Sequence, residues 1–429
     1  MAEANDTLAA AAPARILPWP KRFDVALLSF IALVIAYCDR VNLSVAAPTI
    51  IKEYGWDTRQ MGWALTAFFI GYTGFMVPAG RLTDFLGPRR MFAFNILWWS
   101  AFTVLTPLPG SLLPLVAVRL LMGMGESGVF PAMNSILVRW FPRDEYSRVT
   151  AFCWSGGYAG SIIGFPVASA ILATWGWPAI FYLFGVLGVI WLPLWWWGVR
   201  DWPEHSASVG REELSRITGS RPNLEKVEVV PWGKLLRLPH LWAAWILHFS
   251  SNWISYLMIS WLPTYLSSER GFSLSSMAFG AAAPFLCAMA GANFFGVAMD
   301  RLSQRHDRTL VRKWFLAPYL MAALLLLAVP AITSPVGLVC TLCGAMFFVT
   351  ASVPTYASSA LDIAPRYAGT VVGMQSAFAN LAGVLAPVVV GYLVKFLGWS
   401  SAFILAAAVA GVGIAVYLIF GKTERMEDS

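Results

Sequence analysis

Arg119 and Glu126 lie seven positions apart within the apolar stretch of residues 114–138. Seven residues advance a helix by about 700°, so the two side chains share one face, about 10.5 Å apart along the axis. Asp39 and Arg40 form a second charged pair inside an earlier apolar stretch. A charged side chain at the centre of a bilayer costs about 2.5–3.5 kcal/mol on insertion scales. These four residues therefore predict a site for an ion and a charged substrate inside a membrane.

The elements that must position these charges are long apolar helices. The chain has 429 residues, of which 58% are hydrophobic and 12% are charged, about half the charged content of a soluble protein. No Asp, Glu, Lys, Arg or His occurs in residues 149–199, 314–361, 367–394 or 396–421. One transmembrane helix needs about 20 such residues, and these runs lack the alternation of a barrel. The sequence predicts an all-α membrane protein.

Gly, Pro and charged residues divide the chain into twelve expected transmembrane helices. Their expected spans are 24–48, 60–80, 90–108, 112–138, 148–174, 178–199, 241–264, 274–299, 314–331, 335–361, 367–394 and 399–420. A polar segment separates the first six from the last six. The expected organisation is an N-terminal tail (1–23), an N-terminal half (24–199), a linker (200–240), a C-terminal half (241–420) and a C-terminal tail (421–429).

Two sequence motifs of the first half of the chain recur in the second half. The Gly-Trp pair that begins at Gly176 recurs at Gly398, 222 residues later. The spacing Gly-x-x-x-Asp that begins at Gly80 recurs at Gly296, 216 residues later. Similar offsets at two places indicate a duplicated six-helix unit. Repeats of this kind place a substrate site near the membrane midplane, between the halves.

The net charge of +7 follows the positive-inside rule and does not indicate a nucleic-acid partner. With both termini cytoplasmic, 24 of the 30 Lys and Arg fall on the inner side. Four fall outside, and these are Lys52, Arg59, Arg270 and Lys395. The expected partners are therefore the lipid bilayer and a small solute. The loop after the first predicted helix is short and holds no N-x-S/T site, so we expect a bacterial inner-membrane protein, and we expect it to be a monomer.

Residues 80–90, between the second and third predicted helices, form the sharpest loop motif. Its glycines permit a tight turn and close helix approach. Its aspartate can pair with a basic residue or face a helix N-terminus. We expect the residues of this motif to form contacts that hold the protein in one of two alternating conformations, and we call them the conformational clasp. The alternative is an ordinary charged loop. The expected clasp residues are Gly80, Asp84, Gly87, Arg89, Arg90 and, from the second copy, Asp300.

This loop resembles the signature of the major facilitator superfamily. Four further segments are similar to its anion:cation symporter family, which includes sialin, the vesicular glutamate transporters and bacterial sugar-acid permeases. These segments are residues 37–46, 119–131, 252–266 and 361–369. The resemblance runs from about Asp24 to Gly421. It implies organic-anion transport, usually with protons in the bacterial members, and it does not specify the substrate.

Buried arginine is a fixed cation whose planar fork suits a carboxylate. Arg40 is the first expected contact for the anion, followed by Arg119. Ionised Glu126 is expected to pair with an arginine of helix 1 or helix 4, and its protonation would free that arginine for the substrate. Asp39 is the expected second proton site. As alternatives, Arg119 and Glu126 form a structural ion pair, or the pair at residues 39–40 gates the outer mouth.

Polar residues in other helices are expected to contact a hydroxyl-rich substrate. Tyr72 lies two turns before the clasp loop, and Asn380 is the lone asparagine of the predicted helix at residues 367–394. A buried amide needs a partner, which is either the substrate or a neighbouring helix. Weaker candidates are Tyr256, Ser358 and Gln375. His248, near the start of helix 7, is expected at the membrane interface rather than in a proton relay.

The expected function is proton-coupled symport of an organic anion, with a sugar acid (an aldonate, hexuronate or aldarate) as the leading substrate. Alternatives are an aromatic or dicarboxylic acid, or a drug exporter, which has little need for two buried arginines. A signalling receptor would need a cytoplasmic signalling segment longer than the predicted linker. No nucleophile–base pair, phosphate loop or metal-ligand cluster is visible, so we expect no enzyme, cofactor or metal. The C-x-x-C at Cys340 and Cys343 lies in an apolar helix and is expected to pack.

Overall fold

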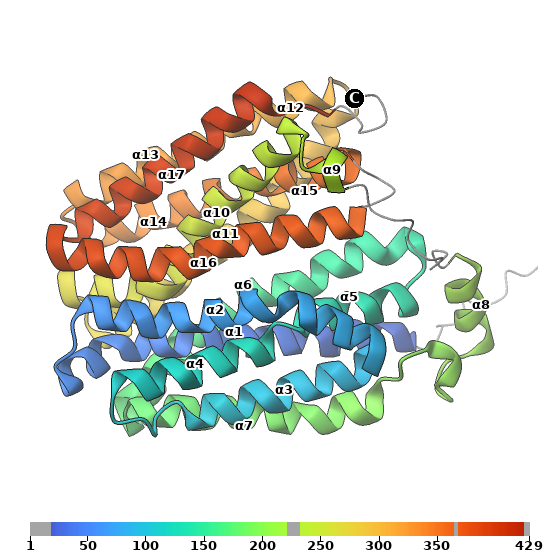
Figure 1. Ribbon diagram of the computed structural model, residues 1–429, viewed down its shortest axis with the longest axis horizontal. Helices are drawn as coiled ribbons and strands as arrows, with labels where there is room; N and C mark the ends of the chain where they lie inside the picture. Colours follow the sequence, from blue (N-terminus) through green and yellow to red (C-terminus); the bar gives the residue numbers. More distant parts are fainter. Residues whose placement is uncertain (1–18, 221–231, 364–367, 424–429) are drawn as a thin grey trace, which may run out of the picture.

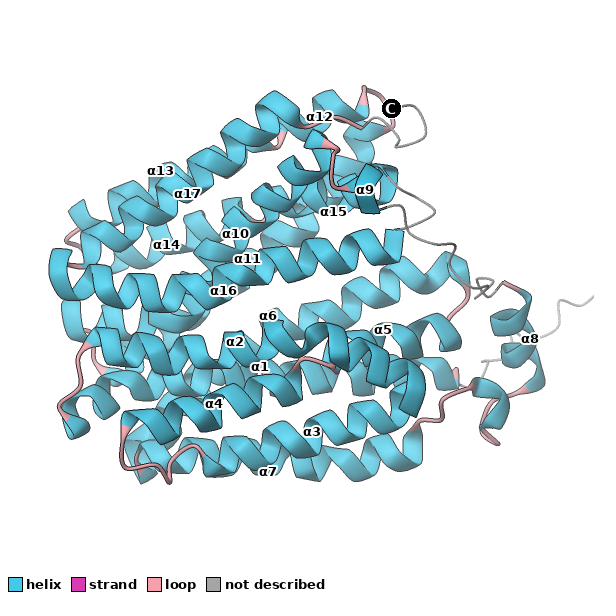
Figure 2. Cartoon of the chain, in the orientation of Figure 1, coloured by secondary structure: helices cyan, strands magenta, loops and turns pink. Residues whose placement is uncertain are grey.

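The computed structural model describes residues 19–220, 232–363 and 368–423, and these contain helices and no strand (Figure 2). This confirms the predicted all-α class. The first group of helices is α1 (Lys21–Tyr54), α2 (Thr58–Leu86), α3 (Pro88–Leu105), α4 (Leu112–Glu126), α5 (Val129–Trp140), α6 (Arg143–Trp175) and α7 (Trp177–Gly198). The next segment holds η1 (Pro203–His205), α8 (Arg211–Gly219) and α9 (Trp232–Leu235). The second group is α10 (Pro239–Thr264), η2 (Tyr265–Glu269), α11 (Leu274–Ser303), α12 (Arg308–Trp314), α13 (Leu316–Ala328), η3 (Val329–Ala331), α14 (Pro335–Val349), α15 (Ser352–Ile363), α16 (Ala368–Leu397) and α17 (Trp399–Phe420).

The long helices run side by side in two groups, α1–α7 and α10–α17 (Figure 1). We call these groups the N-terminal and C-terminal halves. In the described part of the chain, nine helical segments are long and apolar enough to cross a membrane. The twelve predicted spans correspond to these nine together with α1, α3 and α10. α1 carries seven charged residues, and two of them are the predicted site residues Asp39 and Arg40.

Some predicted segments fall partly outside the described residues. These are most of the two expected tails, part of the expected linker (221–231), and residues 364–367 of the segment that resembles the symporter family.

The predicted loop at residues 80–90 is wrong in its extent. α2 continues to Leu86, so Gly80 and Asp84 are helical. The turn needs a single residue, Gly87, whose φ of 83° is in the region that favours glycine. α3 begins directly at Pro88, whose fixed φ suits a first helical position. The tight turn predicted from the glycines is therefore present, but only at the second of them.

The two halves contact each other closely where α2 begins and α16 ends, and we call this the closed end. Thr58 Oγ1 donates a hydrogen bond to Gly391 O (2.8 Å). Thr66 Oγ1 donates to Val384 O (3.0 Å). A Cβ added to Gly62 would lie 2.9 Å from a backbone oxygen of α16. Hydrogen bonds and a close glycine crossing therefore join α2 to α16 at this end.

Charged residues surround this crossing at the closed end. Asp57 caps α2, because its carboxylate accepts a hydrogen bond from the Gln60 N–H (3.0 Å). The same carboxylate lies 3.1 Å from Arg59 and 3.7 Å from Lys395 of the other half. Burial alone raises the pKa of Asp57, but the hydrogen bond from Gln60 and the nearby Arg59 hold this pKa below its usual value. The carboxylate therefore stays ionised in mild acid, and the cap is lost only at lower pH.

At the opposite end, which carries both described chain ends and α8, the two halves diverge (Figure 1). We call this the open end. Gly74 and Gly80 on α2 and Gly373 on α16 each have no heavy atom within 4 Å of an added Cβ. Phe85, in the last turn of α2, is 86% exposed. The helices that cross tightly at the closed end are thus apart here.

Replacing Gly62 by valine is expected to shift the protein away from this conformation, because the new side chain overlaps the backbone of α16. Overpacking costs about 1–3 kcal/mol. The test replaces Thr58 by cysteine in a background without the five native cysteines. With Gly62→Val, this cysteine should react with a membrane-impermeant thiol reagent at least about fivefold faster than it does with the native Gly62. Gly74→Val on the same helix is the matched control, since it meets open space. Equal labelling in the two variants would show that the crossing does not set the conformation.

Candidate functional site

The first two site residues lie next to each other in the middle of α1. Successive residues of a helix point about 100° apart, so Asp39 and Arg40 contact different neighbours. Asp39 reaches α3, and Arg40 reaches α2 and α4. Both side chains are buried, Arg40 with 6% exposure. α1 thereby joins three other helices through two charged groups.

Arg40 forms a buried ion pair with Glu126, which is 1% exposed. Its Nε donates to Glu126 Oε1 at 2.6 Å. Its Nη2 lies 2.6 Å from the same oxygen but is not aligned for a hydrogen bond. Glu126 Oε2 has no hydrogen-bond partner among the described residues. An arginine fork fits two carboxylate oxygens, so this pair is matched in charge but incomplete in hydrogen bonding.

Aromatic rings surround the Arg40 guanidinium. Its central carbon lies 4.6 Å from the Tyr37 ring centroid, 4.7 Å from that of Tyr72 and 5.4 Å from that of Phe68. Ring faces attract a cation, most strongly where water is excluded. The rings therefore keep Arg40 charged and in place when its carboxylate partner changes.

Asp39 has a different environment. Its Oδ2 accepts a hydrogen bond from Trp99 Nε1 (3.1 Å). Its Oδ1 has no hydrogen-bond partner in the described part of the chain. A buried polar atom without a partner is costly, so this oxygen is a place where a proton or a ligand would be stabilising.

Arg119 lies on the same helix as Glu126, as predicted, but it is not the ion-pair partner. No carboxylate among the described residues lies within 4.0 Å of Arg119. Its Nη1 donates to Met122 Sδ (3.0 Å), and its guanidinium lies 5.3 Å from the Phe68 ring centroid. Arg119 acts on Glu126 and Asp39 through longer-range electrostatics. The four charges of the cluster sum to zero when all are ionised.

Two glycines bring α4 against α2 beside this cluster. A Cβ on Gly123 would lie 1.9 Å from Phe68 O, and one on Gly71 would lie 2.0 Å from Leu120 O. Small residues of this kind let membrane helices approach closely. The approach places the Arg119 guanidinium against the Phe68 ring and holds the site on closely packed helices.

The C-terminal half contributes uncharged polar groups. Tyr256 of α10 donates to Asn380 Oδ1 of α16 (2.5 Å), and Asn380 Nδ2 donates to Ser376 O (2.8 Å). The buried amide of Asn380 thus has the helix–helix partner that was the alternative to a substrate contact. The Tyr256 ring lies 4.5 Å from that of Phe69 on α2, which brings this pair to the N-terminal half.

A second polar group of this half centres on Gln375. Its Nε2 lies 3.3 Å from His248 Nδ1 and donates to Tyr356 O (3.2 Å). The His248 ring stacks on Tyr356 at 3.9 Å. Gln375 Oε1 has no hydrogen-bond partner among the described residues. His248 follows the first residue of α10, Pro239, by more than two turns; its expected position at the membrane interface stays a prediction.

The structure brings most of the predicted site residues together but not all of them. The Arg40 guanidinium lies against the Tyr72 ring of α2, and Tyr256 of α10 contacts Phe69 of the same helix, so the N-terminal cluster and the α10–α16 pair adjoin. The hydroxyl of Ser358 instead donates to Pro354 O (2.6 Å) within its own helix, α15. No described contact joins Ser358 to the charged cluster.

Three aromatic residues of the site were not predicted as site residues, namely Tyr37, Phe68 and Trp99. Tyr37 precedes Arg40 by three residues and therefore shares its helix face, a signal that could have identified it. Phe68 and Trp99 lie among many similar rings in α2 and α3, and nothing in their local sequence distinguishes them.

The predicted clasp residues are not joined across the two halves in this conformation. Asp84 and Asp300 are exposed and have no ion pair within the described residues. The N–H of Arg89 donates to Asp201 Oδ1 (2.9 Å), and the Arg89 guanidinium lies 4.1 Å from the Trp196 ring centroid. Asp201, which was not predicted, thus takes the role at the α3 N-terminus that was suggested for Asp84. Gly87 provides the turn, and Arg90 is exposed.

Comparison with known families identifies the chain. Residues 29–387 match the model of the Major Facilitator Superfamily. The chain is a member of this superfamily. Members are membrane transporters, so this protein is a multi-pass membrane transporter rather than an enzyme, and the predicted resemblance is confirmed.

Two of three relatives that the chain matches are named for anions. The chain is 33% identical to "Sodium-dependent phosphate transport protein 1, chloroplastic" of Arabidopsis thaliana, over 99% of this chain and 84% of that protein. It is 34% identical to the "Probable sulfoacetate transporter" of Cupriavidus necator, over 88% of this chain and 89% of the relative. It is 31% identical to human sialin, over 94% of this chain and 90% of sialin.

A solved structure shares the fold. It is a bacterial homologue of the human lysosomal transporter Spinster in an inward-facing, unoccupied conformation. The TM-score is 0.80 with 17% sequence identity, covering 94% of this chain and 98% of the other. At this identity the likeness supports the major facilitator fold and nothing about the substrate.

Proposed function

We propose that this transporter carries an organic anion together with protons by alternating access around the Arg40 site. The observation that carries the proposal is the buried Arg40–Glu126 pair, in which one carboxylate oxygen and one guanidinium nitrogen lack hydrogen-bond partners. The phosphate and sulfoacetate named in two relatives support an anion as cargo. The experiment is uptake by purified protein in proteoliposomes, with and without an inward proton gradient.

The coupling step exchanges one carboxylate for another at Arg40. Protonation neutralises Glu126 and ends its attraction to Arg40. The substrate carboxylate then takes the freed guanidinium, which can offer it both nitrogens of the fork. Asp39 is the second proton site, since its Oδ1 has no partner. Proton and anion thereby favour each other's binding, as symport requires.

The proposed substrate class is a sugar acid with a single carboxylate. Both arginines of the cluster belong to the N-terminal half, whereas the adjoining groups of the other half are uncharged: Tyr256, Asn380 and Gln375. Such groups suit hydroxyls and offer no cation for a second carboxylate. The rings around Arg40 favour the second candidate, an aromatic acid. An uptake panel of aldonates, hexuronates, aldarates and aromatic acids distinguishes these classes.

Replacing Tyr256 by phenylalanine is expected to weaken sugar-acid binding by about five- to tenfold, because a hydrogen bond is worth about 1 kcal/mol. Binding of an aromatic acid should change little. Tyr319→Phe, which removes a hydroxyl paired with Ser250 in the same half, is the matched control. Titrating both acids onto the purified variants measures the effect. Equal losses in the two variants would assign Tyr256 a purely structural role.

The proposed membrane orientation places both termini, and thus the open end, in the cytoplasm of a bacterium. The four basic residues expected outside include Arg59 and Lys395, which lie at the closed end. Most of the other Lys and Arg residues would then lie on the cytoplasmic side, as the positive-inside rule requires. Reporter fusions at the C-terminus test this: a fluorescent protein should be active there, and a periplasmic phosphatase should not.

We propose that the predicted halves move as units, with Asp84 and Asp300 forming contacts when the open end closes.

Proton coupling has a specific rival, because one relative is named as sodium-dependent. A sodium gradient alone, imposed at equal pH on both sides, should drive no accumulation. Accumulation under that condition would replace the proton assignment while leaving the anion site in place.

A further inference from the structure

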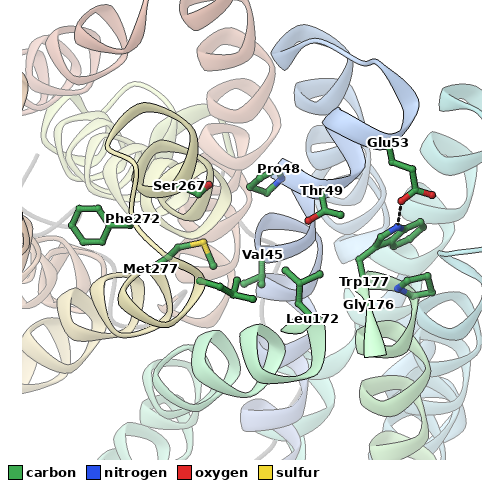
Figure 3. A pocket seen from close by; sticks show the side chains of 12 residues that line it. Val45, Pro48, Thr49, Glu53, Leu172, Gly176, Trp177, Ser267, Phe272 and Met277 are labelled. Carbon is green, nitrogen blue, oxygen red and sulfur yellow. Dashed lines mark hydrogen bonds between the residues drawn. The ribbon is translucent and has the colours of Figure 1, made fainter. Parts of the chain in front are cut away.

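A cavity of about 690 Å³ lies near the closed end, and Figure 3 shows the residues that line it. Its walls come from both halves. α1 supplies Glu53, and the start of α7 supplies Trp177. The C-terminal half supplies Phe272 and Met277, the latter from α11. None of the residues of the Arg40 site lines this cavity.

The chemistry of the lining differs from that of the Arg40 site. Glu53 is the single charged residue among the lining residues, and no Lys, Arg or His belongs to the wall. Trp177 Nε1 donates to Glu53 Oε2 (2.7 Å), which places an indole beside the carboxylate (Figure 3). Leu172, Phe272 and Met277 make the rest of the wall largely apolar. Glu53 is exposed to solvent beside this apolar cleft. Its negative charge repels an anion, so this cavity suits a ligand of opposite charge.

We propose that this cavity binds an organic cation with an apolar body. The cationic group would lie at the Glu53 carboxylate, next to the Trp177 indole that donates to it, since aromatic rings attract cations. The apolar body would lie against Phe272 and Met277, where it leaves water.

Occupancy of this cavity is coupled to conformation. The wall residues of α1 and α7 belong to one half, and those of η2 and α11 belong to the other. Opening the closed end separates these walls and dismantles the site. A ligand that binds one conformation shifts the population toward it, so the cation holds the closed end shut. It therefore inhibits transport without competing with the anion for Arg40.

The test uses tetraphenylphosphonium and tetraphenylborate, which match in shape and apolar surface but differ in charge. Equilibrium binding to the purified full-length protein in detergent should be saturable for the phosphonium and absent or much weaker for the borate. Glu53→Gln keeps an acceptor for Trp177 and removes the charge, so phosphonium affinity should fall about fivefold. Glu269→Gln, an exposed acid of η2 outside the lining, is the matched control and should bind like the unmodified protein.

Three outcomes would overturn the proposal: no saturable phosphonium binding, equal binding of both probes, or unchanged affinity in Glu53→Gln. A conformational arm uses Gly62→Val, which should weaken phosphonium binding, and Gly74→Val, which should not. Equal affinity in these two variants would overturn the coupling to the closed end. The binding measurements need no transported substrate, so their failure is distinct from failure of the proposed anion transport.

Discussion

Replacing Arg40 by alanine is expected to lower affinity for the transported anion at least about 100-fold. Truncating one partner of a buried, hydrogen-bonded charge pair costs about 3–5 kcal/mol, and the substrate carboxylate is proposed to use the same guanidinium. Anion titration onto the purified protein measures the loss. Arg40→Lys keeps the charge but loses the planar fork, so it should recover only part of the affinity. Arg119→Ala should cost less, since Arg119 has no carboxylate within 4.0 Å among the described residues.

A control must separate lost binding from lost folding, because Arg40→Ala leaves Glu126 buried without its counter-charge. The double variant Arg40→Ala/Glu126→Gln removes both charges. It should recover thermal stability relative to Arg40→Ala, since removing both partners avoids an uncompensated charge. It should not recover anion binding. A stable double variant that binds the anion with unchanged affinity would exclude Arg40 as the anion contact.

Glu126→Gln is expected to abolish proton-driven accumulation while anion exchange across equal concentrations continues. The amide has nearly the shape of the acid but carries no exchangeable charge, so it no longer competes with the substrate for Arg40. Exchange needs no net proton movement and should persist. Both activities are measured on the same proteoliposomes, first with a pH gradient and then with labelled anion inside and unlabelled anion outside.

Glu145→Gln is the matched control for this prediction. Glu145 also pairs with arginines, Arg22 and Arg216, but it lies at the open end of α6 outside the proposed site. Its replacement should leave proton-driven accumulation in place. If Glu126→Gln still concentrates the anion when driven by protons, the coupling role passes to Asp39, whose replacement by asparagine should then stop accumulation.

Most of the fold follows from composition and local pattern. Charge-free runs longer than a bilayer-spanning helix predict several of the helices, and the few charges inside other apolar stretches predict the candidate site. The spacing of Arg119 and Glu126 correctly places them on one helix. It could not identify Arg40 as the partner of Glu126, because those residues are 86 positions apart and meet only through the packing of α1 against its neighbours.

Two further features depend on the whole fold. The motif at residues 80–90 looks like a loop because it is rich in glycine and charge, yet Gly80 and Asp84 are helical and Gly87 alone makes the turn. Glycine is common in membrane helices, so composition does not mark where such a helix ends. The local sequence also does not predict which end of the two halves is closed, since the same side chains must allow the closed and the open arrangement at each end.

The most direct test of the central claim is the number of protons taken up when one anion binds to the purified protein. Calorimetric titration in buffers of different ionisation enthalpy gives this number. If the substrate displaces Glu126 from Arg40, binding near neutral pH should take up about one proton or more per anion, and Glu126→Gln should take up about one fewer. Anion binding with no proton uptake in the unmodified protein at any pH would contradict the account.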